Sequence, residues 1–251
     1  MERLFTAERA HLPMADCSDI QIALRDGETL PAYLARADGP SLADGIVLVQ
    51  EIFGVNANMR ALADDYAARG FNAIVPDLFW RQEPGVQLDP ADAADGERAT
   101  ELMRGIDTAL ALDDAVAAAA HLRSFDNASG KVGAVGFCLG GKLAYLLATR
   151  PEIDAAVSYY GVAIHGVLDE AKGVRAPLLL HIAQQDQLCP PEAQTAIKNA
   201  LASNANVTIL DYPSVGHAFA RRGSSGFDEA AADKANHATA DFLARTLRTA
   251  A

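Results

Sequence analysis

The chain has 251 residues, with 21 Lys and Arg against 33 Asp and Glu, and a formal net charge of −12. Half of the residues are apolar and 22% are charged, so the chain can fill a sizeable core and is not of the disordered class. Its acidic balance, without any cluster of Lys or Arg, excludes the positive face that nucleic acid or an anionic membrane would require.

The first predicted elements are two short alternating runs that are joined by a segment containing Asp26 and Gly27. An Asp-Gly pair between alternating strands predicts a β-hairpin. The later strands are continuous apolar runs that alternate with helical stretches, a pattern typical of a parallel sheet with helices on both faces. In chain order, strands are predicted at residues 20–24, 30–34, 46–49, 73–75, 132–137, 155–159, 178–183 and 207–210.

The predicted helices lie between these strands. Gly70 follows the first helix, and a loop rich in Pro, Gly and Asp at residues 83–95 precedes one long helix that ends near Ser124. Further helices are predicted at residues 139–149, 192–201 and about 227–246. The alternation predicts one α/β domain over residues 1–251, with a mostly parallel sheet, an N-terminal antiparallel hairpin and an extension at residues 1–15.

The sharpest chemical signal is Cys138, which follows an apolar strand and has Gly136 and Gly140 two residues to either side. Gly-x-nucleophile-x-Gly is the spacing of a nucleophile elbow, in which a strained strand-to-helix turn lifts the central side chain above the sheet. The next helix begins beside the thiol, so its N-terminal amides would favour a thiolate and an adjacent oxyanion. We therefore predict that Cys138 is a nucleophile.

Two other interpretations of this segment compete. Residues 136–142 match the first part of a P-loop, but the next residue is Leu143, where a Ser or Thr would have to bind magnesium. Cys138 could also be a small buried hydrophobe, which is the commonest role of a free cysteine. We adopt that interpretation for Cys17 and Cys189, whereas the glycines around Cys138 favour a nucleophile there.

A nucleophilic cysteine needs a base and an orienting acid, because a thiol is mostly protonated at pH 7. In the α/β-hydrolase order, the acid and then the histidine follow the nucleophile, each in a loop after a later strand. Asp186 and His217 lie directly after the last two predicted strands. Among the other histidines, His181 is predicted to be a hydrogen-bonded core residue, and His165 is the one rival for the base.

Glu51 is a further candidate. It lies just after the apolar strand at residues 46–49, at the edge where ligands bind in open α/β sheets. Composition alone favours a solvated carboxylate at such a position. An acid beside a reactive thiol is a liability, however, unless it handles the proton of the thiol.

Taken together, these residues resemble the dienelactone hydrolase (carboxymethylenebutenolidase) family, which has the α/β-hydrolase fold. The resemblance spans nearly the whole chain in the order of the family and excludes residues 1–15. It rests on residues 50–56 (QEIFGVN), 76–81 (PDLFWR), 136–141 (GFCLGG), 159–161 (YYG), Asp186 and residues 216–221 (GHAFAR).

The resemblance implies a catalytic triad of Cys138, His217 and Asp186. It also implies that Glu51 takes the proton of the thiol when substrate displaces the carboxylate, which keeps the resting cysteine neutral. The predicted function is hydrolysis of a small anionic lactone or enol ester that bears a carboxylate, through an acyl-thioester and without a cofactor or metal.

The resemblance further assigns the groups that bind the substrate. The backbone amides of Ile52 and Leu139 correspond to the oxyanion hole. Arg81 and Arg221 correspond to arginines that bind a substrate carboxylate, although the neighbouring Arg222 leaves open which of the last two points inward. A guanidinium suits this role because it can hold a planar carboxylate with two hydrogen bonds.

Three alternatives remain at this point: hydrolysis of another small activated ester, a ligand-binding relative without activity, and a thiol redox protein that pairs Cys138 with Cys189. No C-x-x-C spacing supports the last. The unpaired cysteines and the lack of an apolar leader predict a cytoplasmic protein, and the single domain predicts a monomer.

Overall fold

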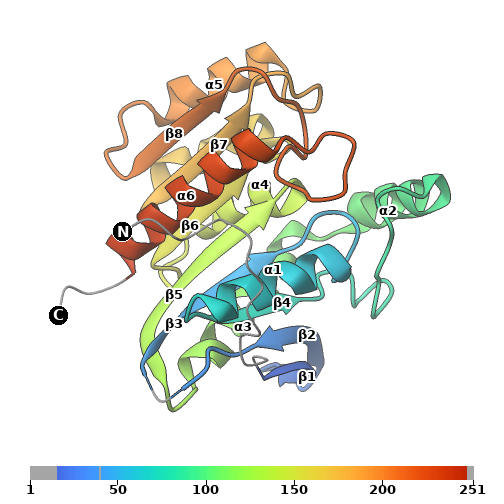
Figure 1. The fold of residues 1–251 in the computed structure, drawn as a ribbon, viewed down its shortest axis with the longest axis vertical. Helices are drawn as coiled ribbons and strands as arrows, with labels where there is room; N and C mark the ends of the chain where they lie inside the picture. Colours follow the sequence, from blue (N-terminus) through green and yellow to red (C-terminus); the bar gives the residue numbers. More distant parts are fainter. Residues whose placement is uncertain (1–15, 40, 248–251) are drawn as a thin grey trace.

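A computed structural model describes residues 16–39 and 41–247. They form one eight-stranded sheet with the strand order β1-β2-β4-β3-β5-β6-β7-β8 (Figure 1). The predicted extension at residues 1–15 lies outside the described residues. The strands are β1 (Cys17–Ala23), β2 (Thr29–Ala35), β3 (Ala43–Val49), β4 (Asn72–Pro76), β5 (Ala128–Phe137), β6 (Ala155–Tyr159), β7 (Leu178–Ala183) and β8 (Val207–Tyr212).

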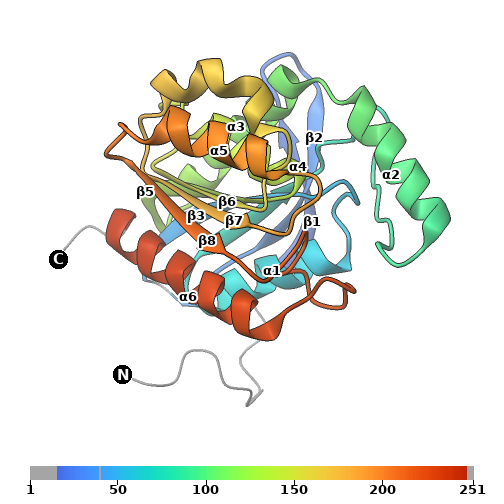
Figure 2. The ribbon, with the colours of Figure 1, turned by 90° about the horizontal axis from the view of Figure 1, so that it is seen from above.

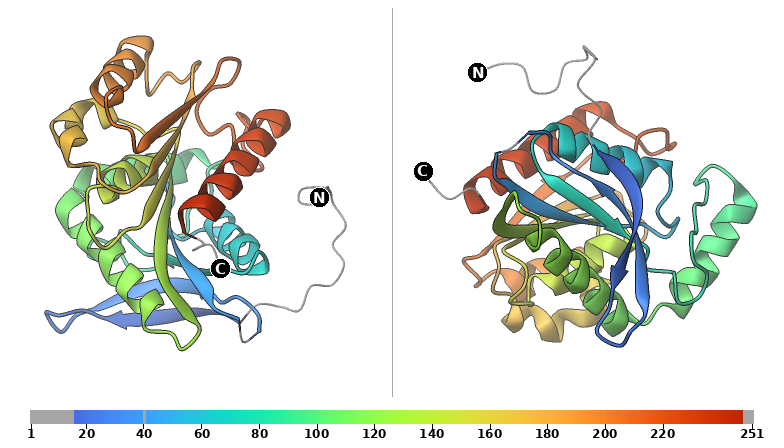
Figure 3. Two further views of the ribbon diagram at one scale, coloured as in Figure 1. Left: turned by 90° about the vertical axis from the view of Figure 1, so that its left-hand side faces the viewer. Right: turned by 90° about the horizontal axis from the view of Figure 1, so that it is seen from below.

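The predicted N-terminal hairpin is confirmed. β1 pairs with β2 in an antiparallel register that places Cys17 opposite Ala35. Gly27 adopts φ 89° in the turn, which suits a residue without a Cβ, and Asp26 Oδ1 accepts a hydrogen bond from the N–H of Glu28 at 3.0 Å. β2 also pairs antiparallel with β4, so the hairpin extends the sheet at the end far from α5 and β8 (Figure 3).

Helices cover both faces of the sheet. They are α1 (Ala57–Ala68), α2 (Ala93–Gly105), α3 (Thr108–Arg123), α4 (Leu139–Leu147), α5 (Pro191–Leu201) and α6 (Glu229–Thr246), with a 3-10 segment η1 (Ile164–Gly173). α3, α4 and α5 lie on one face, and α1 and α6 lie on the other (Figure 2). Strands β4, β6 and β7 are therefore buried along their whole length, as expected for a parallel sheet. Within the described ranges, none of the helices combines the length and the apolar character of a membrane span.

The prediction of one long helix ending near Ser124 is wrong. The chain forms two helices there, because α2 ends at Gly105 and the next residue, Ile106, is extended with φ −71° and ψ 128°. Asp107 then begins α3 as its N-cap, and its carboxylate accepts hydrogen bonds from the N–H groups of Ala109 and Leu110. An Asp at this position stabilises a new helix start more than it stabilises a helix interior.

The parallel strands place the predicted site residues together. β3, β5, β6, β7 and β8 are parallel neighbours, so their carboxyl ends meet at one edge of the sheet. Glu51 follows β3, Cys138 follows β5, Asp186 follows β7 and His217 follows β8. Residues that are far apart in the sequence therefore converge on one edge.

Candidate active site

Cys138 occupies a sharp turn between β5 and α4. Its backbone has φ 56° and ψ −115°, a strained conformation for a residue with a side chain. The N–H of Cys138 donates to the carbonyl of Tyr159 at 3.1 Å, and its carbonyl accepts from the N–H groups of Gly141 and Val162 at 3.0 and 3.2 Å. These hydrogen bonds hold the turn from both sides, with the buried thiol at the start of α4.

The glycines around Cys138 are required by close backbone contacts. A Cβ on Gly136 would lie 1.9 Å from the carbonyl oxygen of Gly140. A Cβ on Gly140 would lie 2.1 Å from the carbonyl oxygen of Val49 and 2.6 Å from that of Gln50. The sharp turn predicted from the glycine spacing is therefore present, and α4 begins directly against the end of β3.

His217 and Asp186 form a hydrogen-bonded pair beside Cys138. His217 Nδ1 lies 2.8 Å from Asp186 Oδ2, while Asp186 Oδ1 accepts the N–H of Leu188 at 2.8 Å. Burial lowers the pKa of His217, but hydrogen bonds to Asp186 and Cys138, together with their negative charges, outweigh it and raise that pKa to about 10. Asp186 and a charged Cys138 therefore both favour the imidazolium form.

Glu51 and Arg221 form a second buried pair at the same edge. Arg221 Nη1 donates to Glu51 Oε2 at 3.1 Å, and the guanidinium lies 5.2 Å from the centre of the Phe53 ring. Within the described residues, Glu51 Oε1 and Arg221 Nε are both buried without a hydrogen-bond partner. Buried polar atoms without partners are costly, so this pair marks a place where a polar ligand or water can bind.

The structure distinguishes Arg221 from Arg222. The side chain of Arg221 is 15% exposed and faces Glu51, whereas that of Arg222 is 70% exposed and lies 3.6 Å from Asp65 on α1. Arg221 is therefore the one that points into the site.

Arg81 is held by an acidic residue that the sequence analysis did not single out. Arg81 Nη1 and Nη2 donate to Asp114 Oδ2 and Oδ1 on α3 at 2.5 and 3.0 Å, and the indole N–H of Trp80 donates to the same carboxylate at 3.0 Å. The side chain of Asp114 is only 2% exposed. The contact of Arg81 with a substrate carboxylate remains a prediction, and it would compete with this bidentate pair. Asp114 lies inside a helix, where the sequence pattern contains no signal for such a partner.

The Arg81→Ala variant is expected to lose about 3 kcal/mol of unfolding free energy, because it leaves the Asp114 carboxylate buried without its cation. Denaturant unfolding measures this loss. The matched control is Arg150→Ala, which removes an exposed pair with the adjacent Asp113 at 3.4 Å and should change stability by less than about 0.5 kcal/mol. Equal effects of the two variants would contradict a structural role for the Arg81 pair.

The two predicted oxyanion-hole residues lie on neighbouring segments. Leu139 is the first residue of α4, so its N–H is among the amides that have no acceptor within the helix. Ile52 lies two residues after Gln50, whose carbonyl oxygen lies against Gly140 in the first turn of α4. The positive end of the α4 dipole lies at the same place and favours negative charge there.

The two other histidines considered above, His181 and His165, lie in different surroundings. His181 is buried, with Nδ1 2.9 Å from the hydroxyl of Tyr212 and Nε2 2.9 Å from Thr239 Oγ1, which confirms the prediction of a core residue. Burial lowers its pKa to about 3. His165 is exposed in η1.

Among residues 16–39 and 41–247, no group of three or more His, Cys, Asp and Glu could hold a metal ion.

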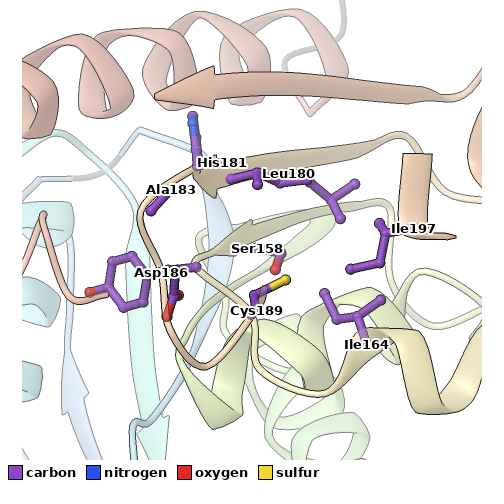
Figure 4. A pocket seen from close by; sticks show the side chains of 11 residues that line it. Ser158, Ile164, Leu180, His181, Ala183, Asp186, Cys189 and Ile197 are labelled. Carbon is purple, nitrogen blue, oxygen red and sulfur yellow. The ribbon is translucent and has the colours of Figure 1, made fainter. Parts of the chain in front are cut away.

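A small cavity lies beside Asp186 (Figure 4). Asp186, Cys189 and Ser158 contribute to its lining, and its free volume of about 10 Å³ is the space of one water molecule. Burial raises the pKa of Cys189 to about 11, which agrees with the prediction of an unreactive buried thiol. The prediction of a buried thiol is wrong for Cys17. This cysteine is exposed in β1, and its thiol donates a hydrogen bond to Asp64 Oδ1 at 3.2 Å.

Comparison with known proteins identifies the family. The model of the dienelactone hydrolase family matches residues 30–247. A protein of Azospirillum brasilense that is named as a carboxymethylenebutenolidase is 43% identical over 231 residues, covering 92% of this chain and 99% of the relative. The carboxymethylenebutenolidase of Pseudomonas putida is 40% identical over 225 residues, covering 90% and 95%.

A solved structure gives the same result. A Klebsiella pneumoniae protein classed with the dienelactone hydrolases has a TM-score of 0.81 at 28% identity, covering 91% of this chain and 98% of that one. Its strand and helix arrangement is thus shared with the sheet described above. This chain therefore belongs to the dienelactone hydrolase family and is a lactone or ester hydrolase with the α/β-hydrolase fold.

Proposed function

We propose that the protein hydrolyses a small lactone or enol ester that carries a carboxylate, through a thioester on Cys138. The observation that carries this proposal is the convergence of a strained, buried cysteine, a His217–Asp186 pair and a buried Glu51–Arg221 pair on one sheet edge. Cys138 and the His217–Asp186 pair supply the groups of cysteine-dependent acyl transfer. Arg221 of the Glu51–Arg221 pair supplies a cation in a chain whose net negative charge repels anions.

Binding of substrate prepares the thiol. The substrate carboxylate accepts hydrogen bonds from Arg221, which has an unpaired Nε, and thereby replaces Glu51 as its partner. The released Glu51 carboxylate accepts the proton of the Cys138 thiol. The hydrogen bond to Asp186 raises the pKa of His217 and favours its imidazolium form even beside a neutral thiol, which supports a separate base for this first proton.

The thiolate then attacks the carbonyl carbon, and a carbon–sulfur bond forms as the carbonyl oxygen becomes an oxyanion. The N–H groups of Ile52 and Leu139 stabilise this charge, together with the N-terminus of α4. Collapse of the intermediate breaks the bond to the ring or ester oxygen, and an enolate leaves. A good leaving group is required because the intermediate expels a thiolate more readily than an alkoxide, so unactivated esters should react poorly.

Formation of the thioester changes the environment of His217. Cys138 raises the pKa of His217 through both a hydrogen bond and its negative charge, and the neutral thioester removes the charge. The pKa of His217 therefore falls after acylation, and the imidazolium can give its proton to the leaving enolate. The neutral imidazole, oriented by Asp186, then takes a proton from water, whose oxygen attacks the thioester and displaces the thiolate. Glu51 returns its proton to the thiolate as the product acid leaves, which restores the resting enzyme.

The Arg221→Met variant tests the carboxylate site. We expect kcat/KM for a carboxylate-bearing dienelactone to fall about 100-fold, because a charge-assisted hydrogen bond in a buried site is worth up to about 3 kcal/mol. A neutral aryl ester should lose less than about 5-fold, since it makes no such bond. Steady-state kinetics with both substrates measure the difference.

The Arg222→Met variant is the matched control, because Arg222 is the adjacent arginine and points outward. It should leave both substrates close to the wild-type rates. Equal losses on the charged and the neutral substrate in Arg221→Met would contradict an anion site and favour hydrolysis of another small activated ester. Arg81→Ala belongs in the same assay, where a loss restricted to carboxylate-bearing substrates would support its predicted role as a second ligand.

A further inference from the structure

The backbone around the candidate site contains a cluster of unusual conformations. Within residues 16–39 and 41–247, the non-glycine residues with φ between 38° and 60° are Cys138, Tyr160, Ala163 and Ala218. Cys138 is the proposed nucleophile, Ala218 follows His217, and Tyr160 lies at the end of β6 between the two. A positive φ is unfavourable for a bulky aromatic residue, and such strain persists where the surrounding structure enforces it, often at functional sites.

The turn that contains Tyr160 holds the backbone of Cys138. The residue before it, Tyr159, accepts the N–H of Cys138, and Val162 donates to the Cys138 carbonyl. The N–H of Tyr160 itself donates to the carbonyl of His181 at 2.9 Å, which fixes the turn to β7. The conformation of this turn therefore determines where the peptide groups on either side of the thiol lie.

The ring of Tyr160 contacts the loop that carries His217. Its centre lies 5.1 Å from the His217 ring at an interplanar angle of 70°, and 5.6 Å from the Phe219 ring at 71°. The same ring lies 6.2 Å from Phe137, the residue before Cys138. The ring of Tyr160 thus connects the end of β5, next to Cys138, with the loop after β8 that contains His217.

The hydroxyl of Tyr160 is not suited to proton transfer. Burial raises the pKa of Tyr160 well above its ordinary value, and the charges of Glu51 and Cys138 raise it further. The phenol is therefore neutral at neutral pH. A role that needs an ionised Tyr160 is thus excluded, and the Tyr160→Phe variant below separates its hydroxyl from its ring.

We infer that Tyr160 is a positioning residue, whose ring holds the His217 imidazole against Cys138 and whose strained turn fixes the nucleophile. This inference rests on the proposed function, in which His217 gives and takes protons beside the sulfur. A buried aromatic neighbour limits sideways motion of the imidazole and excludes water from its hydrogen bond to Asp186. Misplacement of a catalytic group by about 1 Å can cost about 100-fold in rate.

Three variants test the inference. Tyr160→Leu removes the ring, Tyr160→Phe keeps it without the hydroxyl, and Tyr66→Leu is the matched control. Tyr66 is also a buried tyrosine with one edge-to-face partner, Phe71 at 5.8 Å, but it lies on α1. Assays use a carboxylate-bearing dienelactone, which can release Glu51 as the proposed mechanism requires, and unfolding curves confirm that each variant is folded at the assay temperature.

We expect Tyr160→Leu to lower kcat about 10- to 100-fold with KM changed less than about 2-fold, because the ring acts on the imidazole and not on the substrate. Tyr160→Phe and Tyr66→Leu should stay within about 3-fold of the wild type. Wild-type kcat in Tyr160→Leu would overturn the inference, as would a loss in Tyr160→Phe equal to that in Tyr160→Leu. If Tyr160→Leu does not fold, Tyr160→Met fills the same space with a flexible chain and replaces it.

A second readout needs no substrate. The Nδ1 proton of His217, hydrogen-bonded to Asp186, should exchange with solvent about tenfold faster in Tyr160→Leu than in the wild type or Tyr160→Phe, as measured by NMR. Unchanged exchange in Tyr160→Leu would overturn the positioning role even if Cys138 is the nucleophile. Faster exchange together with full turnover in Cys138→Ala would instead refute the proposed function.

Discussion

Cys138→Ala is expected to lower the turnover of a carboxylate-bearing lactone by about 10⁴-fold or more. Loss of a nucleophile leaves only the oxyanion and binding contributions, which give modest residual catalysis. In the wild type, acid quenching during turnover followed by peptide mass spectrometry should find the acyl group on Cys138. Steady-state rates with the cis and trans dienelactones measure the loss.

Cys189→Ala is the control for this variant, because Cys189 is also buried at the carboxyl edge and is a free thiol. It should stay within a few-fold of the wild-type rate and carry no acyl group. Wild-type turnover in Cys138→Ala would refute the nucleophile assignment. Stoichiometric labelling of Cys138 without turnover would instead support a ligand-binding relative, and a Cys138–Cys189 disulfide under mild oxidant would support a redox role.

The same variant has a second expected effect, on His217. Cys138 helps to raise the pKa of His217 by a hydrogen bond and, as a thiolate, by its charge. Both contributions disappear in Cys138→Ala, while burial continues to disfavour the imidazolium, so the pKa of His217 should fall. NMR titration of the imidazole measures it, and an unchanged pKa would contradict the reasoning that acylation frees His217 to act as a base.

Gly140→Ala is expected to lower the unfolding free energy by about 3 kcal/mol and to abolish most activity. Its Cβ would lie 2.1 Å from the carbonyl oxygen of Val49, so the start of α4 must move away from the end of β3. That movement displaces the amide of Leu139 from Ile52 and shifts Cys138, and a displacement of about 1 Å can cost about 100-fold in rate. Denaturant unfolding and steady-state kinetics measure the two effects.

Gly96→Ala provides the matched control. Gly96 lies in α2, and a Cβ there would meet no atom within 4 Å. Alanine has the higher helix propensity, so this variant should be more stable than the wild type by up to about 1 kcal/mol and fully active. If Gly140→Ala behaved like Gly96→Ala, the close packing of the elbow against β3 would be disproved.

Much of the fold could be predicted because its signals are local. The Asp26–Gly27 turn predicted the hairpin, and the continuous apolar runs predicted buried parallel strands, most of them within a few residues of their observed ends. The long helix near Ser124 was the main error. Helical periodicity continues across the break, and the competing preference of Asp107 for an N-cap determined the outcome.

The site could be predicted in part. The glycine spacing around Cys138 and the order of Asp186 and His217 after later strands were sufficient to name the triad candidates, which the fold brings to one edge. Sequence reasoning missed Asp114 and assigned no role to Tyr160, although the YYG motif contributed to the family resemblance. Both residues act through side-chain contacts with distant segments, and such contacts leave no periodic signal.

Short stretches of sequence were enough to indicate the α/β class, the family and the elbow, because glycine spacing and apolar runs reflect the steric needs of a few neighbouring residues. The packing of distant segments, by contrast, brings Arg221 and not Arg222 to Glu51 and pairs Arg81 with Asp114. An ion pair depends on which way each side chain points and on the burial of its partner. Those properties arise only when segments far apart in the chain pack together.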